Sequence, residues 1–428
     1  MSSFVPTTDT DVFTSSAAYA DVEGWHETVT PLRRAAPVVR LEGTGIEPVW
    51  AVLRHTEVLE VERQNELFTS APACTVSQAR AVSSPGYKPS PMKTLVEMDG
   101  DEHQAHRLVV NKWFLPGSIR RLGAAITARA EDAIADMDRL DGSCDFARDI
   151  AIRYPLNVIM TLFGVPDTDY ETMLRLTQAL MEAQDPDSGS ASAETMLEFY
   201  EYFRVLAEER RAEPRDDLAS VIANAEINGE PVGDLGTFGL YLIIATAGHD
   251  TTSSAVAGGM EALIAHPEHI DALRSDPGLI ANATEEIIRW VSPVKHFLRT
   301  AQGDCELGGA HIREGDRVLL SYPSANRDEL VFDDPATFDV ARPNADHHIA
   351  FGFGRHYCLG AHLARLEVVK FFELLIPRLD HIEATGPCQN LESSMVSGPI
   401  SLPITYKLRR DSEGPMPHLN TFDTKEKT

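Results

Sequence analysis

Positively charged residues are scarce in this sequence. The chain of 428 residues has 38 Lys and Arg against 65 Asp and Glu, which gives a formal net charge of −27 at pH 7. Nucleic acids and anionic membrane surfaces attract basic proteins and repel a chain of this charge. The composition therefore argues against both as partners.

Long hydrophobic runs and a cysteine framework are also missing. Segment 1–20 is polar and acidic and has no apolar core of a signal peptide, and the most apolar run, 238–247, is too short to span a bilayer. The five cysteines have no framework spacing, which is typical of proteins in a reducing compartment. We therefore expect a cytoplasmic protein.

Helical periodicity dominates the rest of the sequence. Apolar residues make up 43% of the chain, enough for a sizeable core, and segment 118–232 has an almost entirely helical pattern. Short strand patterns occur at 38–41, 48–53 and 317–321, and the Ser-, Pro- and Gly-rich segment 71–92 predicts a long loop.

The expected fold class is therefore mainly α with small β-sheets. We expect a flexible N-terminus at 1–18, a single domain at 19–408 and a polar C-terminal tail at 409–428.

One stretch, 351–360 with the sequence FGFGRHYCLG, carries the strongest chemical signal. Its three glycines let the backbone turn sharply and lie against a flat ligand. Cys358 stands where this loop meets a predicted helix at 361–379, and the amide groups and the dipole of a helix start favour a thiolate over a thiol. A thiolate of this kind is the axial iron ligand of haem-thiolate enzymes.

Two other interpretations of this stretch exist. A dinucleotide-binding loop is excluded, since the third glycine of G-x-G-x-x-G is absent. Cys358 could also be a buried, inert cysteine. That is the better interpretation of the remaining cysteines, Cys74, Cys144, Cys305 and Cys388.

A second stretch lies at the centre of the longest predicted helix, from about 234 to about 265. Segment 245–254 reads ATAGHDTTSS, and its glycine and hydroxyl residues are poor helix formers whose hydroxyls can bond back to preceding carbonyls. The stretch is either a buried helix bent by Ser and Thr, with Asp250 paired to an arginine, or a site of oxygen activation. His249 is expected to be a core or surface histidine.

Together the two stretches resemble motifs of the cytochrome P-450 family. Segment 351–360 is similar to the haem-binding signature of that family, and 245–254 is similar to the centre of the helix that covers its haem. From about Tyr19 to Leu408 the motifs follow the order and spacing of a bacterial, soluble member. The resemblance implies a triangular helical domain with a long central helix over one b-type haem.

The resemblance also implies roles around the haem. Cys358 would ligate the iron, and the residues expected to bind the haem through the loop are Phe351, Gly352, His356 and Gly360. Arg107, Arg299 and His356 would bind the haem propionates, together with His103.

On the central helix, the resemblance implies oxygen chemistry. Ala247 and Gly248 would leave space over the iron, Asp250 would feed protons, and Thr251 would hydrogen-bond dioxygen. Thr252 is the third catalytic candidate.

A further motif is structural. Glu286 and Arg289, three residues apart on a predicted helix, could form a routine helical salt bridge. In the family such a pair joins an arginine from a later segment, here Arg342, in a buried triad that supports folding and haem retention.

Within the family, segments 245–254, 292–301 and 321–329 are similar to those of a terpene-hydroxylating member. This likeness implies a small, mostly hydrocarbon substrate, such as a monoterpenoid or an alkylbenzene. The residues expected to line the pocket are Ile243, Ile244, Ala247, Val294, Phe297, Met395 and Val396.

No segment similar to a reductase is present, so we expect electrons from a [2Fe–2S] ferredoxin served by a separate NAD(P)H-dependent ferredoxin reductase. The basic residues expected near its docking site are Lys112, Arg120, Arg121, Arg365 and Lys370.

Two rival functions stay open at this point. One is a P-450-like isomerase, dehydratase or peroxygenase, against which the Asp250–Thr251 pair argues. The other is a haem-based sensor or binding protein, although no DNA-binding or signalling segment is evident.

Overall fold

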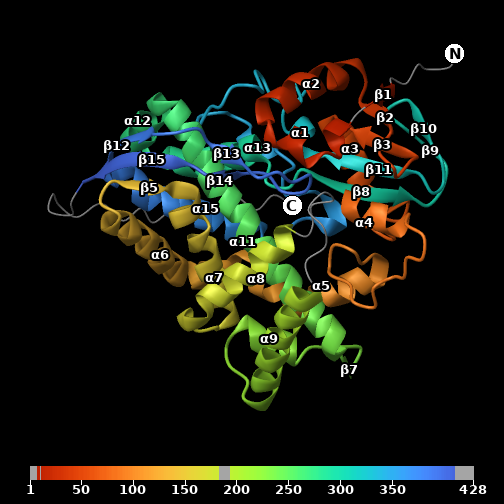
Figure 1. The fold of residues 1–428 in the computed structure, drawn as a ribbon, viewed down its shortest axis with the longest axis horizontal. Coiled ribbons are helices and arrows are strands. Elements are labelled where there is room, and N and C mark those ends of the chain that lie inside the picture. Colours follow the sequence, from red (N-terminus) through yellow and green to blue (C-terminus); the bar gives the residue numbers. More distant parts are fainter. Residues whose placement is uncertain (1–6, 10, 183–192, 410–428) are drawn as a thin grey trace.

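The structure is a computed structural model that describes residues 7–9, 11–182 and 193–409. Figure 1 shows the larger sheet and the N-terminal helices at the upper right, helices α6 to α9 at the lower left, and α11 running between them. This arrangement confirms the expected class, mainly helical with small sheets.

The helices account for most of the described chain. Their bounds are α1 Ser16–Ala20, α2 Val22–Ala35, α3 His55–Arg63, α4 Val76–Val82, α5 Gly100–Phe114, α6 Pro116–Arg139, α7 Arg153–Phe163, α8 Tyr170–Glu182, α9 Ala193–Ala212, α10 Leu218–Ala223, α11 Gly233–Ala265, α12 Pro267–Ser275, α13 Ile280–Val291, α14 Tyr322–Ala325 and α15 Ala361–Arg378. Short helical turns are η1 Asp11–Phe13, η2 Ala147–Ala151, η3 Asp167–Asp169, η4 Pro277–Leu279, η5 Ala345–His347 and η6 Gly354–His356.

The principal sheet has six strands in the order β1-β2-β3-β11-β8-β4. Its strands are β1 Thr7–Asp9, β2 Val38–Glu42, β3 Val49–Val52, β11 Arg317–Ser321, β8 His296–Ala301 and β4 Phe68–Thr69. The strand predictions at 38–41, 48–53 and 317–321 are confirmed. Because β11 pairs with β3 in parallel and with β8 antiparallel, it joins β8, which carries Arg299, to the N-terminal strands β2 and β3.

Smaller sheets complete the strand inventory. They contain β9 Cys305–Leu307 with β10 Ala310–Ile312; β5 Ser143–Asp145 with β12 Leu379–Ala384 and β15 Pro403–Leu408; β13 Gln389–Asn390 with β14 Pro399–Ser401; and β6 Glu226–Ile227 with β7 Glu230–Pro231.

The expectation of a flexible segment at 1–18 is wrong for its described part. Strand β1 pairs in parallel with β2, and the side chain of Phe13 is fully buried. Its ring packs edge-on against Trp25, with ring centroids 5.9 Å apart, and Tyr19 stacks on the same indole at 5.1 Å. Aromatic burial therefore fixes the entry of the chain. Of the tail expected at 409–428, Arg409 donates its backbone N–H to the Arg378 carbonyl at 2.7 Å, and 410–428 lies outside the described residues.

The long loop expected at 71–92 contains a helix, α4. The hydroxyl of Thr75 accepts from the backbone N–H of Gln78, which caps the helix. The Gln78 amide accepts from the Cys74 N–H at 2.9 Å and donates to Glu97 at 2.8 Å, so the helix is tied to the chain on both sides.

Helix α11 has 33 residues and therefore spans about 50 Å at the usual rise per residue. It contacts α7, α9, α13 and α15, which places it across the middle of the helical part. No helix in the described part of the chain is long and apolar enough to cross a membrane.

Candidate functional site

The loop before α15 turns around two glycines. Gly352 and Gly354 both have φ of +67°, a conformation that strongly favours glycine. A Cβ on Gly354 would lie 2.5 Å from the carbonyl oxygen of Glu62, so the loop can approach α3 only without a side chain there. Gly360 differs from the expectation, since its φ is −85° and a Cβ there would meet nothing within 4 Å.

Cys358 is held at the end of this turn. Its backbone N–H donates to the Phe351 carbonyl at 2.9 Å, and the residue is exposed at the surface of the loop. The surrounding protein raises the pKa of the thiol by burial, whereas the Gly360 amide and the cations Arg107 and Arg365 act in the opposite direction. These donors are the groups that would stabilise a thiolate bound to a metal. Burial also raises the pKa of each of the other four cysteines. Of these four, Cys74 has an arginine, Arg299, that acts in the opposite direction, but Glu97 and Asp99 raise its pKa further.

Two arginines near Cys358 have no carboxylate partner in the described part of the chain. Arg107 on α5 donates to the Tyr357 carbonyl at 2.7 Å. Arg299 on β8 is buried, donates to the Leu298 carbonyl at 2.9 Å, and lies 5.6 Å from the centre of the Phe297 ring. Arg107 is half-buried, and the charge of Arg299 acts on the buried Glu62. Neither guanidinium forms an ion pair in the described part of the chain, so the pair suits a ligand that carries two carboxylates.

Two histidines lie beside these arginines. The rings of His103 and His356 have centroids 4.3 Å apart, and His356 Nε2 lies 3.8 Å from Asp99 Oδ1. Burial, His356 and Arg107 lower the pKa of His103 to about 4, so its imidazole is neutral at pH 7. The structure thus brings together all four residues that the sequence assigned to the propionates.

On α11, Ala247 is exposed although the helix around it is largely buried. Thr251 lies one turn later and donates its hydroxyl to the Ala247 carbonyl at 2.8 Å, which confirms the expected back-bonding. Asp250 has one carboxyl oxygen buried without a partner among the described residues, and burial raises its pKa. Its other oxygen lies 3.3 Å from His249 Nδ1, so its partner is the histidine and not an arginine.

Gly248 and Thr252 of this helix differ from their expected roles. A Cβ on Gly248 would lie 2.5 Å from Ile159 Cδ1, so this glycine allows α11 to pack closely on α7 and does not leave space for a ligand. Thr252 is one turn after Gly248 and is buried, so it belongs to the face of α11 that packs in the core. Ile244 is also buried, but it stands three residues before Ala247, shares that side of the helix, and stays a predicted pocket residue.

The expected structural triad is present. Arg289 donates to both oxygens of Glu286, at 2.6 and 2.8 Å, and Arg342 Nε donates to Glu286 Oε2 at 3.0 Å. The side chains of Glu286, Arg289 and Arg342 are 0%, 0% and 5% exposed. The two guanidiniums also donate to the backbone carbonyls of segment 333–337, so the triad ties α13 to that segment.

The apolar residues expected in the pocket come from two further elements. Val294 precedes β8 and forms an isolated antiparallel bridge with Val396. Phe297 is half-buried and packs edge-on against Tyr322, with ring centroids 6.3 Å apart. Met395 is buried, and the backbone N–H of Lys295 donates to its carbonyl at 2.9 Å. Segment 395–398 is therefore attached to segment 293–295, immediately before β8.

The basic patch is smaller than expected. Arg365 makes a two-pronged ion pair with Glu285, at 2.7 and 3.0 Å, and Lys370 pairs with Glu373 at 2.6 Å. Both are partly buried and neutralised. The residues of the patch that stay exposed are Lys112, Arg120 and Arg121.

Several polar residues at this site were missed by sequence reasoning. Asp99 accepts from the backbone N–H groups of Ser70 and Ala71 at 2.8 and 2.9 Å. Glu367 on α15 is fully buried, with neither carboxyl oxygen bonded among the described residues, and burial raises its pKa well above the usual range. The available signal for Glu367 was an acidic residue between the buried apolar positions Leu366 and Val368 of α15.

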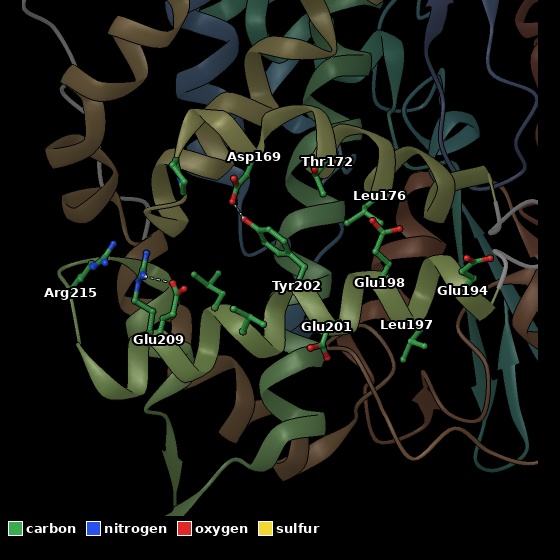
Figure 2. Close-up of a pocket in the computed structure, with 14 residues that line it drawn as sticks. Asp169, Thr172, Leu176, Glu194, Leu197, Glu198, Glu201, Tyr202, Glu209 and Arg215 are labelled. Atoms are coloured by element: carbon green, nitrogen blue, oxygen red, sulfur yellow. Dashed lines mark hydrogen bonds and ion pairs between the residues drawn. The ribbon is translucent and has the colours of Figure 1, made fainter.

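A separate cleft of about 880 Å³ lies between α8 and α9 (Figure 2). Figure 2 shows Tyr202 pointing from α9 toward Asp169, to which it donates at 2.8 Å. Many of its acidic groups pair with arginines of the same helices, as Glu201 does with Arg204. None of the residues singled out by the sequence lines this cleft.

Comparisons with known proteins agree with this geometry. Residues 278–407, which include the triad and Cys358, match the family model described as Cytochrome P-450. Cytochrome P-450-terp of a Pseudomonas species is 39% identical over 407 residues, covering 91% of this chain and 95% of that protein. Linalool 8-monooxygenase of Pseudomonas putida is 33% identical and covers 87% of this chain and 93% of its own length.

Solved structures give the same result. The crystal structure of a cytochrome P-450 from Novosphingobium aromaticivorans superposes with a TM-score of 0.86 at 37% identity, covering 95% of this chain and all of that one. The family uses a haem bound through a cysteine thiolate, and the exposed Cys358, together with two arginines that form no ion pair among the described residues, fits that group. The chain belongs to the cytochrome P-450 family and is a haem-thiolate monooxygenase.

Proposed function

We propose that this monooxygenase hydroxylates a small, mostly hydrocarbon substrate, such as a monoterpenoid or an alkylbenzene. The observation that carries the proposal is the apolar character of the residues around the site: Ala247 on α11 and the Val294–Val396 bridge beside Phe297. None of these residues could pair with a substrate carboxylate or amine. The names of two relatives, P-450-terp and linalool 8-monooxygenase, support a terpenoid as the substrate.

Burial of a small hydrocarbon against these residues can by itself supply the binding affinity. Each buried CH₂ contributes about 0.8 kcal/mol, so about ten carbons supply about 8 kcal/mol, which corresponds to micromolar binding. A compact hydrocarbon therefore needs no charged anchor. A single substrate hydroxyl could be accommodated by a residue of segment 71–92.

The bound haem supplies the activation of dioxygen. Within this proposal Cys358 ligates the iron, Arg107 and Arg299 bind the two propionates, and the His103–His356 pair lies beside them. The support is that Arg107 and Arg299 bond only to backbone carbonyls and form no ion pair among the described residues. Two carboxylates at a buried haem edge need charged donors of this kind.

Proton delivery is assigned to Asp250 and Thr251. The carboxyl of Asp250 is raised in pKa by burial and keeps one oxygen free of hydrogen bonds within the described chain, so it can take and release a proton. The Thr251 hydroxyl lies beside the exposed Ala247 and donates to its carbonyl, and we assign to it the hydrogen bond to dioxygen. Neither isomerisation nor dehydration requires this relay.

Electrons are proposed to come from an acidic [2Fe–2S] ferredoxin. The exposed cations Lys112, Arg120 and Arg121 follow Arg107 on α5 and α6, and they form a local positive surface on a chain of net charge −27. Such contacts give weak, salt-sensitive association. A cytoplasmic location, as the sequence predicts, is part of this proposal.

Two measurements on the purified holoprotein test the function. A reduced, CO-bound difference spectrum should show the red-shifted band of thiolate ligation, and Cys358→His should abolish it. NADH turnover with a ferredoxin system should yield a hydroxylated product.

Substrate class is tested by titrating p-cymene, α-terpineol and a long-chain fatty acid while following the low-to-high spin shift. The cyclic compounds should give the tighter shifts. If the fatty acid binds most tightly and the cyclic hydrocarbons give no response, the proposed substrate class is wrong, although the monooxygenase family stands.

A further inference from the structure

A buried carboxyl group lies against the Cys358 loop, outside the residues that the sequence singled out. Glu62, in the last turn of α3, is 3% exposed. The hydroxyl of Tyr322 donates to Glu62 Oε1 at 2.8 Å, and a Cβ on Gly352 would lie 3.1 Å from the same oxygen. The second oxygen, Oε2, is buried and has no hydrogen-bond partner in the described part of the chain.

The groups around this carboxyl leave it close to its point of ionisation. Burial raises the pKa of Glu62 to about 7, while the charge of Arg299, the Tyr322 hydroxyl and the Phe353 amide act in the opposite direction. Burial raises the pKa of Tyr322 well above its usual range, so the phenol does not titrate near neutrality.

The loop packed on α3 carries four further titratable side chains, Arg355, His356, Tyr357 and Cys358. His356 lies 3.8 Å from Asp99, and burial lowers its pKa, whereas burial raises the pKa of the Cys358 thiol. The α14 side contributes Tyr322, and β8 contributes Arg299. Glu62 is therefore the acidic group of this cluster whose charge can change near pH 7.

We propose that Glu62 is a redox-linked proton acceptor, which takes up one proton from water when the haem takes up one electron. Reduction adds one negative charge to the haem, whose propionate would bind Arg299. The negative charge of an ionised Glu62, which lies near the same arginine, then becomes less favourable, so the pKa of Glu62 rises. The electron comes from reduced ferredoxin, or from an electrode in the test, and the one bond formed is the O–H bond of the carboxyl. The inference rests on the proposed placement of the haem between Cys358 and Arg299.

The consequence is a reduction potential that depends on pH. Below the pKa of Glu62 in the oxidised protein, the carboxyl is protonated in both redox states and the potential is constant. Above that pH, the ionised Glu62 favours the oxidised state, so the potential falls as pH rises through about 7. The protein is thus easier to reduce in slightly acidic solution.

Spectroelectrochemical titration of the holoprotein across this pH range tests the inference. In the wild type, the equilibrium constant for reduction should change by about threefold or more across the step. Glu62→Gln should remove the step. Glu60→Gln is the matched control, because it removes one carboxylate from an exposed position of the same helix and should keep the step.

Tyr322→Phe provides a second variant that keeps the carboxyl. Losing the donated hydrogen bond should raise the pKa of Glu62 further and move the step to higher pH. This variant decides the matter if Glu62→Gln does not retain haem. An unmoved step in Tyr322→Phe, an unchanged step in Glu62→Gln, or no step in the wild type would each overturn the inference.

The CO-bound spectrum of each variant separates this inference from the proposed function. A thiolate band in the wild type and in Glu62→Gln, with identical potential steps, would refute only the role of Glu62. Absence of the band in the wild type would refute the ligation by Cys358 and, with it, the basis of the inference.

Discussion

Replacing Glu286 by Gln should strongly destabilise the protein. Oxygen Oε2 of Glu286 accepts from Arg289 Nε at 2.6 Å and from Arg342 Nε at 3.0 Å, and Oε1 accepts from Arg289 Nη2 at 2.8 Å and from the Asp339 N–H at 2.9 Å. In Glu286→Gln, one of these oxygens becomes an NH₂ group that faces donors only, and two buried guanidiniums lose their counter-charge. Breaking a buried ion pair in this way costs about 3–5 kcal/mol.

A loss of that size is a large share of the stability of an ordinary protein, about 5–15 kcal/mol in total. We therefore expect Glu286→Gln to unfold at much lower urea concentration than the wild type and to retain less haem after purification. Urea unfolding followed by circular dichroism measures the first effect, and the haem-to-protein absorbance ratio measures the second.

The control for this prediction is an exposed ion pair. Asp167 is 67% exposed and pairs with Arg129 at 2.8 Å, so Asp167→Asn should change the free energy of unfolding by at most about 1 kcal/mol. If Glu286→Gln were as stable as Asp167→Asn, the triad would not be the structural element that its burial indicates.

Three further outcomes are expected. Thr251→Ala should still consume NADH and dioxygen but release mainly hydrogen peroxide, and full coupling to product would contradict the proton relay; Asp250→Asn should instead slow turnover. Arg299→Ala should lose haem during purification, measured by the same absorbance ratio, and retention equal to the wild type would argue against propionate binding. Lys112→Glu should weaken ferredoxin-dependent turnover at low salt and approach the wild type at high salt, and identical rates at all ionic strengths would place the docking surface elsewhere.

The longest helix and the strands β2 and β3 could be predicted because their sequence patterns are local. Helix α11 begins and ends within one residue of the expected bounds, 234–265, since an apolar run closed by Pro267 is a strong pattern. Strands β2 and β3 were found for a similar reason. The N-terminal strand β1 was not, because its order comes from pairing with a strand about thirty residues away and from the burial of Phe13.

Site residues show the same division. Arg107, Arg299, His103 and His356 could be predicted as one group because the resemblance to the family implies that they surround one ligand, and the structure brings them together. Which face of α11 is accessible could not be found this way: Gly248 and Thr252 have the same local pattern as Ala247 and Thr251. Only the contact with Ile159 of α7 shows that Gly248 serves packing.

By itself, the sequence determined the resemblance to the family, the cysteine proposed as iron ligand and the positions of the family's motifs along the chain. Each of these depends on residue identity at short spacing. The tertiary structure decided which charges meet. Arg365 is neutralised by Glu285, and Glu62 is buried under a loop almost three hundred residues later in the chain. Burial and pairing depend on neighbours brought together by folding, and these determine whether a charged side chain binds a partner, holds a proton or stays exposed to solvent.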